Sequence, residues 1–121
     1  NTALVMHGSS SVPQELVDEV NKFGGKVPNA RGVPIPMIQD AIKLGVRKIN
    51  IDTDGRLAFT AAIRKVFFEH PEVFDQRKYL GEGRQAIFQW VKSKMLDFST
   101  AGHATDYKHI TIKDMIAVYG K

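Results

Sequence analysis

Two short segments of the chain place chemically useful residue types where strands are expected to end. The first is the run His-Gly-Ser-Ser-Ser at residues 7–11, which follows an apolar run at 3–6. A neutral imidazole is the commonest metal ligand in proteins, and successive backbone N–H groups in a Gly/Ser-rich turn can cradle a phosphate. The same residues also fit a hydrogen-bonded core histidine followed by an ordinary turn, and one histidine alone does not make a metal site.

The second segment is the run Lys-Ile-Asn-Ile-Asp-Thr-Asp at residues 48–54. Successive side chains of a strand point to opposite faces, so Asn50 and Asp52 would share one face. Because a strand that is buried on both faces is normally apolar throughout, these polar side chains indicate a site at its carboxyl end. A helix start is expected directly afterwards, at Asp54. The alternative is a plain turn in which Asp54 serves as the N-cap.

The elements that must position these segments alternate between strand and helix. Strands are predicted at 3–6 and 46–52, with helices from 13 to 23 and from 34 or 36 to 44 between them, because apolar residues recur there at helical spacing between prolines and glycines. A third helix is expected from about Gly55 to Glu69. This order is typical of parallel βαβ architecture, in which ligands bind at the carboxyl ends of the strands.

Beyond Pro71 the sequence predicts helices only. An apolar helical stripe runs through 84–98, and a variant capping box at 111–114 predicts a last short helix that ends at Tyr119. Two strands cannot make a stable parallel sheet, so the terminal helices are interpreted as an extension wrapped around a larger body.

Composition limits the kinds of site that the chain can hold. The 121 residues include 17 basic and 13 acidic side chains, a net charge of +4, and the charges are scattered. This fits anionic substrates and equally an ordinary solvated surface. The absence of cysteine excludes disulfides and thiolate metal sites. Without a membrane-length apolar run or a signal peptide pattern, we expect a cytoplasmic protein with neither membrane nor nucleic acid as a partner.

Together the two segments resemble the class II, zinc-dependent fructose-bisphosphate aldolases, and the serine-rich turn is most similar to the subgroup that includes Calvin-cycle enzymes. The runs at 45–48 and 75–79 support the resemblance, which extends from end to end of this chain and covers only the last third or so of the family's sequence. It implies the C-terminal part of a (β/α)8 TIM barrel. Residues 1–70 would hold strands 7 and 8 with their helices, and residues 71–121 a helical extension of the same domain.

The resemblance also implies roles for individual residues. His7 would be one of three zinc-ligating histidines, with zinc acting as a Lewis acid on the ketone of dihydroxyacetone phosphate. Asn50 would be the catalytic amide that hydrogen-bonds the enediolate oxygen. Arg77 would reach the distal phosphate of the substrate in a neighbouring subunit, whereas the sequence alone suggests only a surface charge. The residues that would grip the other phosphate are Gly8, Ser9, Ser10, Asp52 and Thr53.

The implied function is reversible aldol cleavage of fructose 1,6-bisphosphate to dihydroxyacetone phosphate and glyceraldehyde 3-phosphate, in glycolysis or gluconeogenesis. A homodimer or homotetramer is expected, with zinc as cofactor and a monovalent cation left open. A tagatose-bisphosphate aldolase and a non-catalytic phosphate-binding fragment remain alternatives. The remaining zinc histidines, the catalytic aspartate and the acid/base residue belong to the N-terminal part of the barrel, so this chain alone cannot complete the site. Many family members also have glycine where this chain has Ser9.

Overall fold

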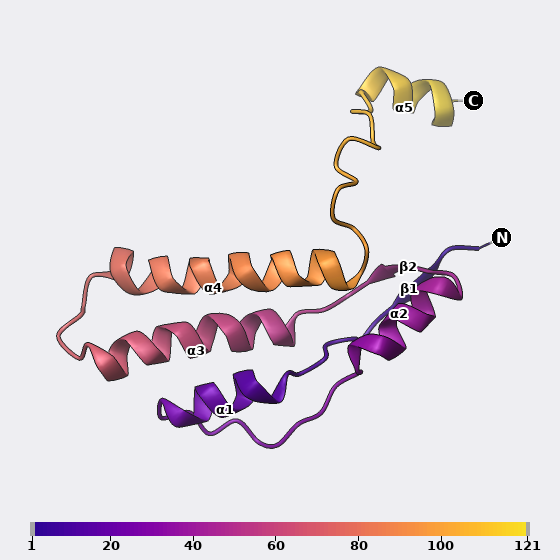
Figure 1. Ribbon diagram of the computed structural model, residues 1–121. Coiled ribbons are helices and arrows are strands. Elements are labelled where there is room, and N and C mark those ends of the chain that lie inside the picture. The colour runs from indigo at the N-terminus through magenta and orange to yellow at the C-terminus, as the bar shows by residue number, and fades with distance from the viewer. Residues whose placement is uncertain (1, 121) are drawn as a thin grey trace.

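The computed structural model describes residues 2–120 and shows an α/β arrangement with a two-stranded parallel sheet (Figure 1). Within these residues, no helix is long and apolar enough to cross a lipid bilayer. The elements in chain order are β1 (Leu4–Met6), α1 (Gln14–Lys22), α2 (Ile35–Lys43), β2 (Val46–Ile49), α3 (Thr53–Glu69), α4 (Gln76–Asp97) and α5 (Ile112–Tyr119).

The parallel βαβ unit predicted from the sequence is confirmed. β1 pairs with β2 so that Leu4 lies opposite Val46 and Met6 opposite Ile49, and α1 and α2 form the crossover between the strands. Leu4 and Val5 remain about half exposed, at 51% each. Because parallel strands are normally covered on both faces, this small sheet is consistent with part of a TIM barrel.

The core lies between α1 and α3. Val17 and Val20, one helical turn apart on α1, are buried against Leu57 and Ala61 of α3. α3 and α4 form an antiparallel hairpin that extends away from the strands (Figure 1). The two helices approach closely at glycines, since the positions that Cβ atoms would take at Gly55 and Gly83 lie against aromatic rings of the partner helix.

Three boundaries differ from the sequence prediction. β2 ends at Ile49 rather than residue 52, and α3 begins at Thr53 rather than about Gly55. α4 begins at Gln76, two turns before the predicted start at residue 84, because Asp75 caps it by accepting a hydrogen bond from the amide of Arg77.

The last helix was predicted correctly and stands apart from the body. α5 opens with a reciprocal capping box, in which the Thr111 hydroxyl accepts from the amide of Asp114 and the Asp114 carboxyl accepts from the amide of Thr111. Its apolar side chains Ile112, Ile116 and Tyr119 are exposed, and α5 projects on the segment that follows α4 (Figure 1).

Candidate functional site

The carboxyl ends of the two strands bring His7 and Asn50 together. The Asn50 backbone amide donates to the carbonyl oxygen of Met6, which continues the sheet by one residue beyond β2. The side-chain amide nitrogen of Asn50 lies 2.9 Å from Nδ1 and 3.3 Å from Nε2 of His7. The pairing of these two residues, 43 positions apart, therefore follows directly from the parallel register of the strands.

Lys48 fixes the orientation of this amide. Its ammonium group donates to Oδ1 of Asn50. An ammonium group has no acceptor, so Oδ1 must face Lys48 and the Asn50 NH2 group must donate to the imidazole. The amide is thereby held with its N–H bonds directed to the end of β1.

The Ser-rich turn is tied to the start of α3. Gly8 has a φ of +64°, a left-handed conformation that glycine adopts without strain and that turns the chain away from β1. The Ser10 hydroxyl oxygen then accepts from the backbone amides of Asp52 and Thr53, at 3.3 and 3.2 Å. These amides belong to the positive end of a 17-residue helix, which is the usual place for an anion in an α/β protein.

In a second connection, α3 supplies the acceptor and the end of the Ser-rich turn supplies the donors. The Asp54 side chain is fully buried, and its Oδ2 accepts from the amide of Ser11 at 2.9 Å and from the hydroxyl of Ser11 at 2.7 Å. Its Oδ1 accepts from the amide of Val12 at 2.8 Å. From the sequence, Asp54 is predicted only as a helix start or an N-cap. In the structure it is the second residue of α3 and binds the distant turn instead.

Ser10 also contacts the loop between α1 and α2, and the neighbouring Ser9 is buried. The Ser10 carbonyl oxygen accepts from the amide of Val33 at 3.0 Å, and a Cβ atom at Gly32 would overlap that carbonyl. The Ser9 side chain is fully buried, with no partner for its hydroxyl within the described residues. A buried hydroxyl without a partner is unusual, which makes Ser9 a position where a ligand atom would be favourable.

Asp52 and Thr53 follow β2 rather than lying within it. The predicted alternation along a continuous strand is therefore wrong for Asp52, whose backbone has left the extended conformation at φ −139° and ψ −49°. The Asp52 carboxylate pairs with Arg56 of α3, at 2.6 Å, and both side chains are largely exposed. Arg56 thus offsets the negative charge of Asp52 beside the proposed phosphate turn.

The structure does not bring Arg77 together with the other predicted residues. Arg77 lies at the start of α4, at the end of the α3–α4 hairpin far from the strands (Figure 1), and its side chain is 87% exposed. Its guanidinium Nε and Nη2 donate to Asp75, with Nη2 2.6 Å from Oδ2. This interaction lowers the pKa of the Asp75 carboxyl and raises the pKa of Arg77.

His7 fits one ligand of a metal but not a complete site. Its imidazole is exposed at the end of β1. The ring nitrogen that accepts from Asn50 has a lone pair, and the same lone pair could bind a metal ion instead. Residues 2–120 contain no group of three His, Asp or Glu side chains that could hold a metal ion. Further ligands would have to come from outside the part of the chain that the structure describes.

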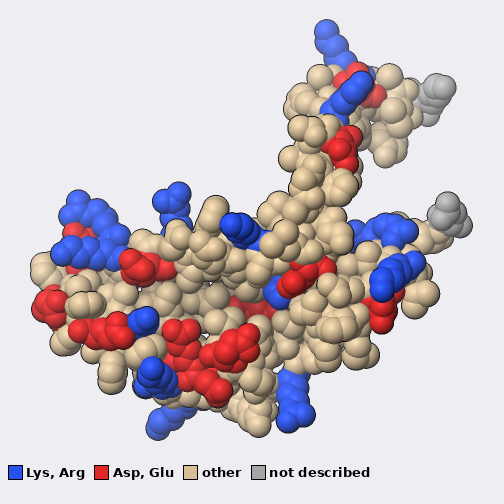
Figure 2. Space-filling model, in the orientation of Figure 1, with Lys and Arg blue, Asp and Glu red and all other residues tan. Residues whose placement is uncertain are grey.

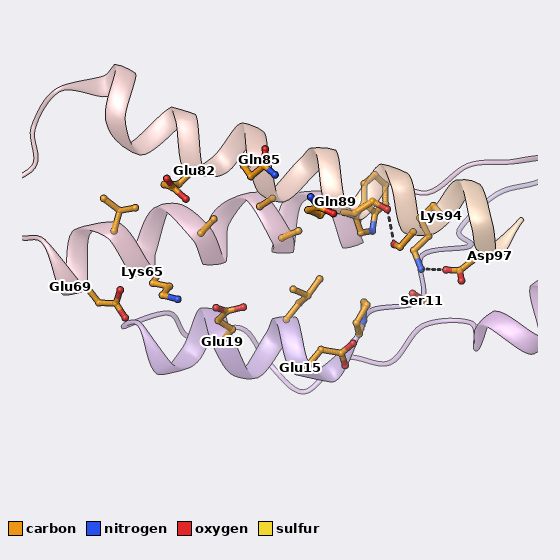
Figure 3. Close-up of a pocket in the computed structure, with 18 of the residues that line it drawn as sticks. Ser11, Glu15, Glu19, Lys65, Glu69, Glu82, Gln85, Gln89, Lys94 and Asp97 are labelled. Carbon is orange, nitrogen blue, oxygen red and sulfur yellow. Dashed lines mark hydrogen bonds and ion pairs between the residues drawn. The ribbon is translucent and has the colours of Figure 1, made fainter. Parts of the chain in front are cut away.

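A separate groove of about 1310 Å³ runs between α1, α3 and α4 (Figure 3). Its rim carries charged side chains of both signs, with Glu15 and Glu19 on α1 facing Lys65 and Glu69 on α3. Figure 2 shows acidic side chains gathered over the middle of this face and basic ones spread around it. None of the residues predicted to form the site lines the groove.

Fold and site together define a βαβ unit of parallel α/β type, with a candidate ligand site at the carboxyl ends of its strands. Comparison with known proteins gives the family. Residues 2–103 match the family described as "Fructose-bisphosphate aldolase class-II". The chain belongs to the class II fructose-bisphosphate aldolase family.

Several aldolases are similar to this chain over nearly its whole length. It is 57% identical over 116 residues to the fructose-bisphosphate aldolase of Giardia intestinalis, covering 96% of this chain and 36% of that protein. It is 50% identical over 121 residues to the fructose-bisphosphate aldolase class 2 of Synechocystis sp., and 44% identical over 121 residues to the fructose-bisphosphate aldolase of Pseudomonas aeruginosa, covering all of this chain and 34% of each relative. The chain therefore spans about a third of the length of the curated relatives it matches.

Proposed function

We propose that this chain is the C-terminal part of a class II fructose-bisphosphate aldolase, a lyase that reversibly cleaves fructose 1,6-bisphosphate to dihydroxyacetone phosphate and glyceraldehyde 3-phosphate. The observation that carries the proposal is the 2.9 Å contact between Asn50 and His7 at the carboxyl ends of adjacent parallel strands. Family membership supports it. The activity belongs to glycolysis or gluconeogenesis, and we place the enzyme in the cytoplasm.

In the complete enzyme, β1 and β2 would be strands 7 and 8 of a (β/α)8 barrel. Residues 1–70 would form the last two βα units, and residues 71–121 a helical extension of the same domain. The half-exposed faces of Leu4 and Val5 support this assignment, because barrel strands are covered on both sides. The N-terminal part of the barrel would supply the covering residues.

The turn of residues 8–10 would bind one phosphate of the substrate. Gly8 allows the turn to present backbone N–H groups, and the Ser10 hydroxyl, which accepts from the amides of Asp52 and Thr53, holds the turn against the positive end of α3. The buried, unpaired hydroxyl of Ser9 would gain an acceptor there. In a barrel of this class, the loops after strands 7 and 8 are the common place for a phosphate.

Asn50 would act on the carbon end of the same substrate. Lys48 and the strand register hold its NH2 group at the carboxyl end of β1, where it would donate to a substrate oxygen on which negative charge develops once His7 binds the metal. A zinc ion, with His7 as one of its three histidine ligands, would supply Lewis-acid polarisation of the substrate ketone.

Arg77 would complete the site of a neighbouring subunit. Asp75 accepts from Nε and Nη2 on one edge of the Arg77 guanidinium, and the side chain remains 87% exposed, so the other edge can reach a group outside this chain. Such a group can hold two oxygens of a phosphate. The enzyme would then be a homodimer or homotetramer.

Replacing the proposed ligand tests the function directly. In the complete enzyme, His7→Ala should lower kcat/KM for fructose 1,6-bisphosphate by at least about 100-fold and reduce the zinc content per subunit, measured by atomic emission. The matched control is His103→Ala, because His103 is an exposed histidine that contacts only Asp106 among the hydrogen bonds of the described residues. Retained activity and zinc in His7→Ala would refute the assignment.

Two further measurements separate the alternatives. Rates on fructose and tagatose 1,6-bisphosphate decide which sugar the enzyme accepts, because nothing at His7 or Asn50 distinguishes their stereochemistry. Zinc content of the complete protein distinguishes an enzyme from a phosphate-binding module: a complete protein that binds phosphate but holds no zinc would favour the module, whereas about one zinc ion per subunit would support the enzyme.

A further inference from the structure

We infer that Asp54 is a positioning residue that holds the Ser-rich turn in its phosphate-binding shape. The inference rests on the proposed function and deepens it. Its basis is a juxtaposition: the buried Asp54 carboxyl group on α3 accepts three hydrogen bonds from Ser11 and Val12, the two residues that follow the turn.

Burial of Asp54 calls for an explanation beyond helix capping. The side chain is fully buried, and no salt bridge to it occurs among residues 2–120. A buried carboxyl group without a cationic partner is costly unless several donors satisfy it. All three donors come from residues 42 or 43 positions away, so its hydrogen bonds stabilise the association of two loops rather than the start of its own helix.

The conformation of Val12 supports the same conclusion. Val12 has a φ of +48°, in the left-handed region that β-branched residues very rarely adopt. Such a conformation persists only where the surroundings hold it. The Val12 amide donates to Asp54 Oδ1 at 2.8 Å, while the Val12 carbonyl accepts from Gln14 Nε2 at 3.0 Å, so Asp54 is one of the contacts that hold this conformation.

The two loops are joined by hydrogen bonds of opposite direction. Asp54 accepts from the amides that follow the turn, while Ser10 Oγ within the turn accepts from the amides of Asp52 and Thr53 at the start of α3. The Ser10 carbonyl is also held, by Val33. Without the Asp54 carboxylate, Ser11 and Val12 would no longer be tied to α3. The backbone N–H groups of residues 8–10 would then lose their fixed geometry. The phosphate-binding step would be weakened, whereas Asn50 and His7 are held by the strands.

The test uses the complete enzyme with its metal. Asp54→Asn preserves the shape of the side chain but directs an NH2 group at a backbone or hydroxyl donor. We expect KM for fructose 1,6-bisphosphate and Ki for inorganic phosphate both to rise about tenfold or more, with kcat changed by less than about threefold and zinc content unchanged. Asp40→Asn is the matched control, since Asp40 is an exposed α2 carboxylate whose one ion-pair partner among residues 2–120 is Lys43, and it should leave all four quantities unchanged.

A milder variant keeps the inference testable if Asp54→Asn fails to fold. Ser11→Ala removes only the hydroxyl donor to Asp54 and leaves both backbone donors. It should raise the two constants about threefold, and adding it to Asp54→Asn should have little further effect because both changes break the same connection. Unchanged constants in Ser11→Ala and in any folded Asp54→Asn would overturn the inference, as would a fall in kcat and zinc content with KM unchanged.

Calorimetric titration with inorganic phosphate separates this inference from the proposed function, because binding does not require turnover. A wild-type enzyme that binds phosphate but cleaves neither bisphosphate would refute the proposed function alone, and weaker phosphate binding by Asp54→Asn would still support the role of Asp54. A wild-type enzyme that binds no phosphate would overturn both.

Discussion

Gly83 of α4 packs directly against the ring of Phe59 on α3. A Cβ atom at residue 83 would lie 2.6 Å from Cε2 and 2.8 Å from Cδ2 of that ring, closer than carbon atoms can approach. Gly81, two residues earlier on the same helix, has open space around it. The pair therefore separates two effects of replacing a helical glycine by alanine, the helical propensity of the residue and the fit between the helices.

The magnitudes follow from this geometry. Alanine in place of glycine in a helix interior stabilises by about 1 kcal/mol, so Gly81→Ala should raise the free energy of unfolding by that amount. Gly83→Ala gains the same propensity term but must displace a half-buried aromatic ring, which costs about 1–3 kcal/mol. The propensity term is common to both variants, so the free energies of unfolding of the two variants should differ by about 1–3 kcal/mol.

Urea denaturation of the complete protein measures this difference, with the denaturant slopes compared to exclude a change in the unfolded state. The variant Phe59→Leu supplies a further control, because in that background the clash is relieved and Gly83→Ala should cost less. If Gly83→Ala proved as stabilising as Gly81→Ala, the close helix contact at Phe59 would be wrong.

Two other predictions concern the loop around the site and the start of α4. Gly32→Ala places a Cβ atom against the carbonyl of Ser10, a backbone group that cannot move alone, so KM for the bisphosphate should rise several-fold with zinc content unchanged; steady-state kinetics showing KM as in wild type would contradict this. Hydrogen bonds from Arg77 hold the pKa of Asp75 below its ordinary value of 3.8, so its stabilising contribution is complete above that value and is lost as the pH falls through the lowered folded-state pKa. Asp75→Asn should therefore be less stable than wild type at about pH 6, and the gap should shrink by about pH 3, measured by urea denaturation at both pH values; a gap independent of pH would exclude the ion pair as its cause.

The order of strands and helices could be predicted because it depends on local patterns. Apolar residues such as Val17 and Val20 recur at helical spacing, and the capping box at Thr111 marks the start of α5 in the sequence itself. The pairing of Asn50 with His7 was also foreseeable, since the carboxyl ends of adjacent parallel strands must meet at one edge. The predicted strand alternation that placed Asn50 and Asp52 on one face was wrong, because β2 ends at Ile49 and the chain then enters α3.

The first two turns of α4 were missed because their sequence lacks a helical signal. Gly81 and Gly83 have low helix propensity, and they interrupt the apolar periodicity that begins later in the helix. At residue 83 the glycine is nevertheless favourable, because it allows α3 and α4 to approach at Phe59. That benefit exists only in the packed pair of helices, so no local rule could reveal it.

The role of Asp54 likewise depends on contacts that form only in the folded chain. A short acidic side chain beside a helix start has a familiar local use as a cap, and local reasoning stops there. Its observed partners at Ser11 and Val12 are separated from it by the whole crossover of α1 and α2, and they become neighbours only after β1 and β2 have paired. In a βαβ unit, the residues after one strand and the first turn of the helix after the next strand are therefore brought together by the sheet. A polar residue at such a helix start can accept either from the amides of its own helix or from the loop that follows the other strand. Burial distinguishes the two: an N-cap side chain is normally exposed, whereas Asp54 is fully buried against the loop after β1.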